Sequence, residues 1–404
     1  MSRRRAVAIA GVTVVVLGTG LGVALARNPD AASVGQTAPQ EQVKGNAAMR
    51  SPVAAADVAA AKAAGNRFLD EYVDGDGRVV RRDQGGDTVS EGQAYGMLIA
   101  AAIDDRPRFD AIWQWTQDNI ERPDKLLSVS WAEGKVSDPL PATDADLDAA
   151  RALLLASERW DVPAYRTAAL EIGNSILLRE TIDVAKRKVL VAGPWARTSP
   201  AVVNPSYFSP RAYDALFEAT GDRRWQELQD TSLEIIDGLT TNSPSLPPDW
   251  ARVHGTQVVP SYQPGDPSKG VRFAYEATRV LPRYAEMCPV YGSDPAAATP
   301  AIGRRLVARA WPFMKAQGPD GPTADYRADG RPLGGNRNAV ATIAAASAAD
   351  ATGEFAERNR LFGVADQVQA QTPTYYGGAW IALGRIMLST DLLGSCGRST
   401  TEIS

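Results

Sequence analysis

The sequence predicts an all-α fold, an (α/α)6 barrel in which six inner helices are enclosed by six outer helices. After residue 54, helical patterns repeat along the chain and are separated by Gly, Pro or Asn. The patterns alternate in character, because small apolar segments follow segments that carry charge on one side. A helix that is apolar all round is buried, whereas a helix with a polar stripe faces water. The inner segments recur without a strict sequence period, which makes a helical solenoid the weaker interpretation.

Twelve helices are expected in order along the chain. They span residues 55–73, 91–104, 107–121, 144–160, 163–180, 206–220, 223–240, 271–286, 299–317, 336–350, 353–370 and 375–390. Strand signals are few, and the best are the short segments "RVVRR" (78–82) and "KVLVAG" (188–193). In such a barrel the loops that lead into the inner helices gather at one end, where a cleft can form.

The first 26 residues have the pattern of an export signal. "MSRRR" is a positive region, residues 6–26 form an uncharged apolar run, and "ALA" is a small-residue cleavage site. The run is also long enough to span a bilayer, so a signal peptide and a signal anchor both fit. We therefore expect the protein to be secreted or anchored to the outer face of the plasma membrane. Membrane contact is expected only through this segment.

The remaining segments divide the chain into a linker, a folded domain and a tail. Residues 27–53 are polar and rich in Pro, Ala and Gln, which is typical of a flexible linker. The folded domain is expected to span residues 54–396, and residues 397–404 form a C-terminal tail.

Composition restricts the chemistry. The chain has 404 residues and a net charge of −4, so no basic field favours a nucleic-acid partner. Its single histidine, His254, lies in a loop, and with two cysteines it cannot assemble the common zinc sites. No metal or other cofactor is implied, and catalysis is expected to rest on carboxylates. Cys288 and Cys396 could form a disulfide in an exported protein or remain separate thiols.

Glu91 is the first candidate catalytic residue. Ser90 and Gln93 match a capping box at the start of an apolar helix, which places Glu91 at the first helical position. The helix dipole favours a carboxylate there, so a simple helix-start charge is one interpretation. Gly92 and Gly96 lower helix propensity without any capping benefit, and this suggests that something bulky approaches the backbone beside the acid.

Two further acidic stretches are candidates. "ATDADLDAARALLLA" (142–156) places Asp144, Asp146 and Asp148 in the first turns of a helix, where acids also complement the dipole. A calcium loop is excluded, because the Gly and the final Glu of that motif are absent. In "FAYEATR" (273–279), Glu276 and Arg279 are three residues apart and can pair on one helix face, which a structural salt bridge would also explain.

Aromatic residues fall in loops or at the starts of inner helices rather than at periodic core positions. They are Trp131, Trp195, Tyr207, Trp250, Tyr375 and Tyr376. Exposed rings along a cleft can stack on sugar faces, although a role in the core or in a lid would also place them there. Together with paired acids and export, they point to hydrolysis of a polysaccharide.

Six motifs resemble those of glycoside hydrolase family 8, in the same order along residues 55–390. They are "SEGQAYGM", "ATDADLDAARALLLASERW", "NPSYFSPRAY", "PDWARV", "AYEATR" and "YYGGAWIALG". The resemblance is strongest to the endoglucanases that accompany bacterial cellulose synthases. It implies an inverting endo-β-1,4-glucanase on an (α/α)6 barrel, acting on β-glucan, with a cellulose synthase as a candidate partner. It also implies Glu91 as general acid, Asp144 as the central-subsite carboxylate, and Arg279 as the arginine that follows the base.

At the position of the base the sequence departs from the family. Glu276 replaces the usual Asp, and its carboxylate reaches about one bond further. An inverting site leaves about 6.5–9.5 Å between acid and base for a water, and a longer side chain could narrow that gap. A polysaccharide-binding accessory without activity is therefore an alternative, as is a family relative acting on xylan, mixed-linkage glucan or chitosan. Other barrel chemistries such as polysaccharide lyases are less favoured, because they usually need a histidine in the site.

Overall fold

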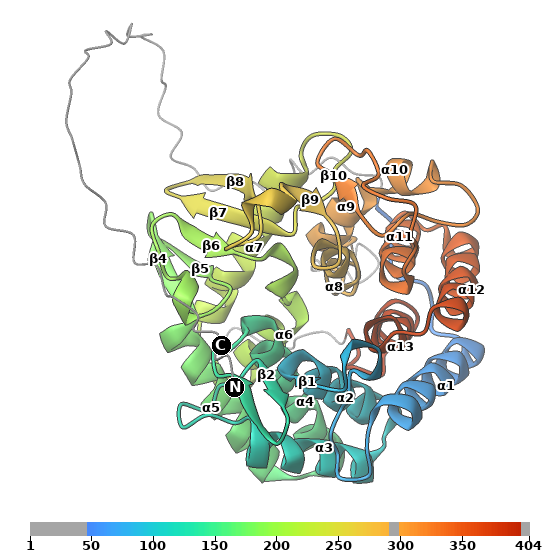
Figure 1. The fold of residues 1–404 in the computed structure, drawn as a ribbon. Coiled ribbons are helices and arrows are strands. Elements are labelled where there is room, and N and C mark those ends of the chain that lie inside the picture. The colour runs from blue at the N-terminus through green and yellow to red at the C-terminus, as the bar shows by residue number, and fades with distance from the viewer. Residues whose placement is uncertain (1–46, 291–298, 397–404) are drawn as a thin grey trace, which may run out of the picture. The chain divides into compact units, whose positions relative to one another are not determined.

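The computed structural model describes residues 47–290 and 299–396. The predicted export signal, most of the predicted linker and the tail lie outside the described residues. Within them, helices form two concentric rings, which confirms the predicted (α/α)6 barrel (Figure 1). None of the described helices is both long and apolar enough to cross a membrane.

The inner ring closes on itself, since each inner helix packs against the next and α13 packs against α2 (Figure 1). Its members are α2 (Ser90–Ile103), α4 (Thr143–Trp160), α6 (Pro210–Thr220), α8 (Val280–Ala285), α11 (Ala339–Ala351) and α13 (Tyr375–Ser389).

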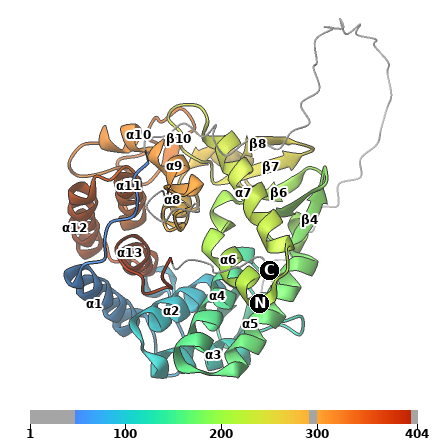
Figure 2. The same ribbon diagram turned by 180° about the vertical axis from the view of Figure 1, so that it is seen from behind.

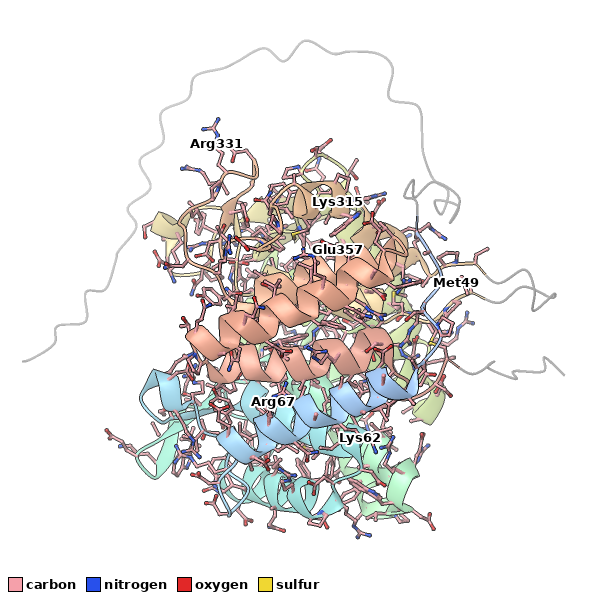
Figure 3. The ribbon with its side chains drawn as sticks, turned by 90° about the vertical axis from the view of Figure 1, so that its right-hand side faces the viewer. Met49, Lys62, Arg67, Lys315, Arg331 and Glu357 are labelled. Atoms are coloured by element: carbon pink, nitrogen blue, oxygen red, sulfur yellow. A yellow bond between two sulfur atoms is a disulfide. The ribbon has the colours of Figure 1, made fainter. Side chains whose placement is uncertain are left out.

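The outer helices pack against the inner ones, and Figure 2 shows the same arrangement from behind. They are α1 (Ala55–Tyr72), α3 (Arg106–Asn119), α5 (Pro163–Arg179), α7 (Arg224–Thr240), α9 (Ile302–Ala308), α10 (Trp311–Lys315) and α12 (Phe355–Gln371). Figure 3 shows the side of the barrel formed by α1 and α12, with the labelled residues Lys62, Arg67 and Glu357 on these outer helices.

Burial explains the two rings. Every residue of α11 is buried, and in α12 only Arg358, Leu361, Phe362 and Ala365 are. The inner helices approach closely because their residues are small: a Cβ added to Gly384 of α13 would lie 2.5 Å from a methyl carbon of Ile343 in α11. The predicted alternation of inner and outer helices is therefore confirmed.

Three predicted helices differ from the structure. The segment 299–317 forms two short helices, α9 and α10, because Pro312 cannot donate a backbone hydrogen bond and would clash with the carbonyl of Ala308 in a continuous helix. The segment 206–220 becomes helical only from Pro210. In the segment 271–286, a short strand and a 3₁₀ turn precede α8.

Short strands form four small antiparallel sheets, most of which the sequence did not predict. The strands are β1 (Thr88–Val89), β2 (Ser130–Ala132), β3 (Lys135–Asp138), β4 (Thr181–Val184), β5 (Arg187–Leu190), β6 (Ala201–Val203), β7 (Trp250–His254), β8 (Gln257–Ser261), β9 (Arg272–Phe273) and β10 (Tyr326–Arg327). Of the two predicted segments, "KVLVAG" contributes to β5, whereas "RVVRR" forms only isolated bridges. His254 ends β7 rather than lying in a loop.

The other irregular elements are 3₁₀ turns. They are η2 (Arg82–Gln84), η3 (Pro194–Ala196), η4 (Pro205–Tyr207), η5 (Pro267–Lys269) and η6 (Ala277–Arg279).

The end of the barrel where the inner helices finish is tied to the start of the described chain. Ala48 donates a backbone hydrogen bond to Ala351, and Arg50 donates to the carbonyls of Met387 and Thr390. Residues 47–51, which the sequence assigned to the flexible linker, therefore pack with the folded domain.

A disulfide joins Cys288 to Cys396 at a sequence separation of 108 residues. The pairing that the sequence left open is thus present in the structure. In the chain-entropy account a cross-link over a loop of this length stabilises the fold by up to about 4–5 kcal/mol.

Candidate active site

A cavity of about 350 Å³ lies where three inner helices begin. Its lining residues are Arg81, Gln84, Val89, Glu91, Tyr95, Tyr275, Glu276, Arg279, Tyr375 and Tyr376. They come from the segment before α2 and its first turns, from the turn before α8 and from the start of α13. The loops before these inner helices therefore meet at one end of the barrel, as predicted.

Glu91 stands in the first turn of α2, but the predicted capping box is wrong. Val89 occupies the cap position, and no side chain caps the helix. The Gln93 carboxamide instead accepts from the Val79 backbone N–H at 2.6 Å and donates to the side chain of Thr116 at 3.0 Å. Gln93 is thus committed to joining the preceding loop to α3, and Ser90 donates to the Glu91 carboxyl at 3.3 Å.

The pKa of Glu91 is raised to about 7. Burial is the main cause, the charge of Asp144 adds to it, and Arg279 acts in the opposite direction. Near neutral pH, a substantial fraction of this carboxyl therefore holds a proton that it can donate.

The glycines beside Glu91 accommodate the protein's own side chains. A Cβ on Gly92 would lie 3.3 Å from the ring of Tyr375, and a Cβ on Gly96 would lie 3.1 Å from side-chain carbons of Val79 and Ile112. The bulky neighbour expected at Gly92 is therefore Tyr375, itself one of the predicted site residues.

The three acids of α4 have different partners. Asp144 accepts from Arg279 at 2.6 Å, and Asp148 forms a two-bond ion pair with Arg283. Asp146 accepts from the Leu127 backbone N–H at 2.8 Å. The second oxygen of Asp144, Oδ1, is buried and has no hydrogen-bond partner among the residues that the structure describes. Burial raises the pKa of Asp144, and Arg279 opposes this rise.

Arg279 is the centre of the cluster. Its guanidinium donates to the Asp144 and Glu276 carboxylates, to the Tyr95 hydroxyl at 2.9 Å and to the Ser206 hydroxyl at 2.9 Å. The predicted pair of Glu276 and Arg279 is therefore present. Arg279 holds two carboxylates in fixed positions beside Glu91.

Glu276 is more open than the other acids. Its side chain is 36% exposed, and its Oε2 also accepts from Asn204 Nδ2 at 3.1 Å. Within the described residues, no group of three or more His, Cys, Asp or Glu side chains could hold a metal ion.

The aromatic residues fall into two groups. Tyr375 and Tyr376 line the cavity, and the Tyr207 ring lies 5.5 Å from the Arg279 guanidinium. Trp131 instead packs edge-on against Trp115 and beneath Arg78, and it does not line this cavity.

Tyr207 is the first of three aromatic rings that lie in a row. Its ring and that of Trp250 are 6.2 Å apart, and the rings of Trp250 and Trp195 are also 6.2 Å apart. Trp195 is 40% exposed, so the row leads from the acids to the protein surface.

Four residues of the cluster were not predicted from the sequence: Tyr95, Asn204, Ser206 and Asp249. Tyr95 follows Glu91 by four residues on one helix face, so its helical spacing could have identified it. Asn204 and Ser206 lie within the quoted motif "NPSYF", but their contacts are with residues more than 70 positions away. Asp249 lies within "PDWARV" and bonds the backbone of the Glu276 turn.

Carboxylates beside aromatic rings at the start of the inner helices are typical of carbohydrate-active proteins, in which acids cleave glycosidic bonds and rings stack on sugars. The particular family follows from the whole sequence. The family model for glycosyl hydrolases family 8 matches residues 40–386, and the chain belongs to this family.

Relatives agree with this membership. A probable endoglucanase of Novacetimonas hansenii is 33% identical over 219 residues, which cover 53% of this chain and 63% of the relative. An endoglucanase of Cellulomonas uda is 32% identical over 47% of this chain and 55% of its own length. The matches thus span between half and two thirds of the length of these two relatives. The solved structure of an endo-β-1,4-glucanase from Acetobacter xylinum has a TM-score of 0.67 at 25% identity, covering 81% of this chain and 97% of that one.

Proposed function

We propose that the protein is an endo-acting glycoside hydrolase that cleaves β-1,4-linked glucan with inversion at the anomeric carbon. The observation that carries the proposal is the arrangement around Arg279, which holds Asp144 and Glu276 beside a Glu91 whose pKa is about 7. The endoglucanases among the relatives support β-1,4-glucan as the substrate.

Glu91 is the general acid in this mechanism. It donates its proton to the glycosidic oxygen as the bond to the anomeric carbon breaks. A carboxyl with a pKa of about 7 retains this proton at neutral pH, whereas an ordinary glutamate would have lost it.

Glu276 is the general base. Its partly exposed carboxylate removes a proton from the water that attacks the anomeric carbon from the opposite side. Arg279 and Asn204 bind one of its oxygens, Oε2, which leaves Oε1 to orient the water.

Asp144, Arg279 and the aromatic rings bind the sugar. The free oxygen of Asp144 can accept from a hydroxyl of the glucosyl unit being cleaved, which would satisfy an otherwise unpartnered buried atom. Tyr375, Tyr376 and Tyr207 provide faces for neighbouring units, and Trp131 would serve a more distant unit.

We also propose that the protein is exported through its N-terminal segment, either cleaved or retained as an anchor, and that it acts beside a cellulose synthase. N-terminal sequencing of the protein from fractionated cells tests the first part. Co-purification with the synthase tests the second.

The experiment that tests the activity is release of reducing ends from carboxymethylcellulose by the protein and by Glu91→Gln. We expect the substitution to lower kcat by about 10²–10⁴-fold, because it removes the proton donor, while binding of cellohexaose persists. Glu357→Gln is the matched control, since Glu357 occupies the first turn of the outer helix α12, and it should retain full activity.

The outcomes separate the candidates. Retained activity in Glu91→Gln would contradict the assignment of the acid. Binding of cellohexaose without any product from the wild-type protein would favour the inactive accessory. Faster cleavage of xylan, mixed-linkage glucan or chitosan would change the substrate. Proton NMR of the first product distinguishes inversion from retention.

A further inference from the structure

Asp249 is a buried acid outside the lining of the cavity. It is 8% exposed and directly precedes β7. Its Oδ1 accepts two backbone hydrogen bonds, from Ala274 and from Ala277, each at 2.9 Å. These two donors stand on either side of Tyr275 and Glu276, so one carboxylate oxygen spans the turn that carries the proposed base.

The turn needs such an acceptor. Glu276 occupies the cap position of η6, which leads directly into α8, but no side chain within the segment caps it. The first N–H groups of a helix lack partners within the helix, and a carboxylate near them is favoured by the dipole. Asp249 supplies this cap from a position 28 residues earlier in the chain.

The same turn is held from other sides. The Tyr376 hydroxyl donates to the Tyr275 carbonyl at 2.7 Å, and the Asp249 N–H donates to the Arg272 carbonyl at 2.8 Å. These hydrogen bonds therefore hold the backbone of residues 272–277 independently of the contacts that the Glu276 side chain makes.

A second partner of the base comes from the same small sheet. β7 pairs antiparallel with β6, with Ala251 opposite Val203, so Asp249, which directly precedes β7, and Asn204, which directly follows β6, flank the same end of this strand pair. Asn204 donates to Glu276 at 3.1 Å. The residues at one end of this strand pair thus supply a backbone anchor, from Asp249, and a side-chain anchor, from Asn204, for the same glutamate.

We propose that Asp249 is a positioning residue. By fixing the backbone on both sides of Glu276, it determines where the Glu276 carboxylate lies relative to the attacking water. The proposal rests on the role of Glu276 as base. A glutamate is longer than the aspartate usual in the family, so the distance from backbone to water must be set by the backbone. A displacement of about 1 Å at such a site costs about 100-fold in rate.

The experiment compares Asp249→Ala with Asp249→Asn in steady-state kinetics on cellohexaose. The alanine variant loses both backbone bonds, and we expect kcat to fall about 10- to 100-fold while KM stays within threefold. The asparagine variant keeps an oxygen acceptor, and we expect kcat within about threefold of wild type. Asp105→Ala, which removes the cap of the outer helix α3, is the matched control and should leave kcat unchanged.

A second arm tests whether Asp249 acts through Glu276. In Glu276→Ala, added azide can attack the anomeric carbon without a base, forming a C–N bond as Glu91 protonates the departing oxygen. We expect Asp249→Ala to lower this azide-driven rate by less than twofold, because no carboxylate remains to be positioned.

Each outcome decides between the proposals. An unchanged kcat in Asp249→Ala, or an equal loss in the azide reaction, would overturn the positioning role and leave the base assignment standing. Full activity of Glu276→Ala without azide would overturn both. If Asp249→Ala does not fold by circular dichroism, Asp249→Ser takes its place with the same expected split between kcat and KM.

Discussion

The two ends of the barrel both contain buried arginines and carboxylates, but they pair them differently. Where the inner helices end, each oxygen of Asp350 faces its own arginine, Arg358 at 2.9 Å and Arg304 at 2.7 Å. Both oxygens of Glu286 likewise accept from Arg151. Where the inner helices begin, a single arginine, Arg279, forms ion pairs with both Asp144 and Glu276, and an Asp144 oxygen has no hydrogen-bond partner in the described part of the chain.

The two kinds of pairing shift the pKa values of the acids in opposite directions. Although burial opposes it, the pairing with Arg151 lowers the pKa of Glu286 below its ordinary value. Burial and the charge of Asp144 instead raise the pKa of Glu91 to about 7. A fully paired acid is locked as an anion and serves stability. A site with fewer cations than acids keeps one carboxyl protonated, as proton donation requires.

The first prediction concerns an ion pair at the end of the barrel where the inner helices finish and the buried acids are fully paired. Glu286→Gln leaves Arg151 as a buried charge without its anion, so we expect the free energy of unfolding to fall by about 3–5 kcal/mol at pH 7 while kcat stays within twofold. Denaturation in urea and the carboxymethylcellulose assay measure the two quantities. Glu234→Gln, which removes an exposed partner of Arg187, should cost less than about 1 kcal/mol. A loss of kcat without a loss of stability would contradict the comparison.

The acids of the site were predictable because their spacing is local. Glu91, Asp144, Glu276 and Arg279 each stand at the start of an apolar inner helix or in the turn before it, and the barrel brings those starts together. Gln93 was misread, because its side chain bonds Val79 and Thr116, and no rule for spacing within a helix contains these contacts. Asp249 was missed for the same reason, since it caps a turn far along the chain.

The fold was predictable where helices are long. The apolar composition of α2 and α11 identifies them as inner helices without any knowledge of their neighbours. Strands of two to five residues, such as β9, carry too few residues for an alternating pattern, and they depend on a partner strand elsewhere. The break between α9 and α10 was readable, because Pro312 lies inside the predicted helix.

The second prediction concerns the pH dependence of the site. Glu91 must hold its proton to act, and its pKa is about 7, so kcat/KM should fall about tenfold per pH unit above that value. Initial rates on cellohexaose from pH 5 to 9 measure this decline. Burial also raises the pKa of Asp249 to about 7. Asp249→Asn should keep the decline if Glu91 causes it, and loss of the decline in this variant would reassign it to Asp249.

The last prediction concerns the free energy of unfolding, which the buried carboxylate of Glu91 lowers when it is ionised. The pKa of Glu91 is about 7 in the folded protein against an ordinary value of 4.5, so ionisation destabilises the fold as pH rises from 4.5 to 7. Glu91→Gln avoids this cost, and we expect it to raise the free energy of unfolding by up to about 3 kcal/mol at pH 8 and by almost nothing at pH 4.5. Glu357→Gln should shift stability slightly the other way at pH 8, because its hydrogen bond with Arg360 lowers the pKa of Glu357. Urea denaturation at both pH values measures this contrast. Equal changes in the free energy of unfolding of the two variants would mean that ionising Glu91 destabilises the fold no more than ionising a surface acid does.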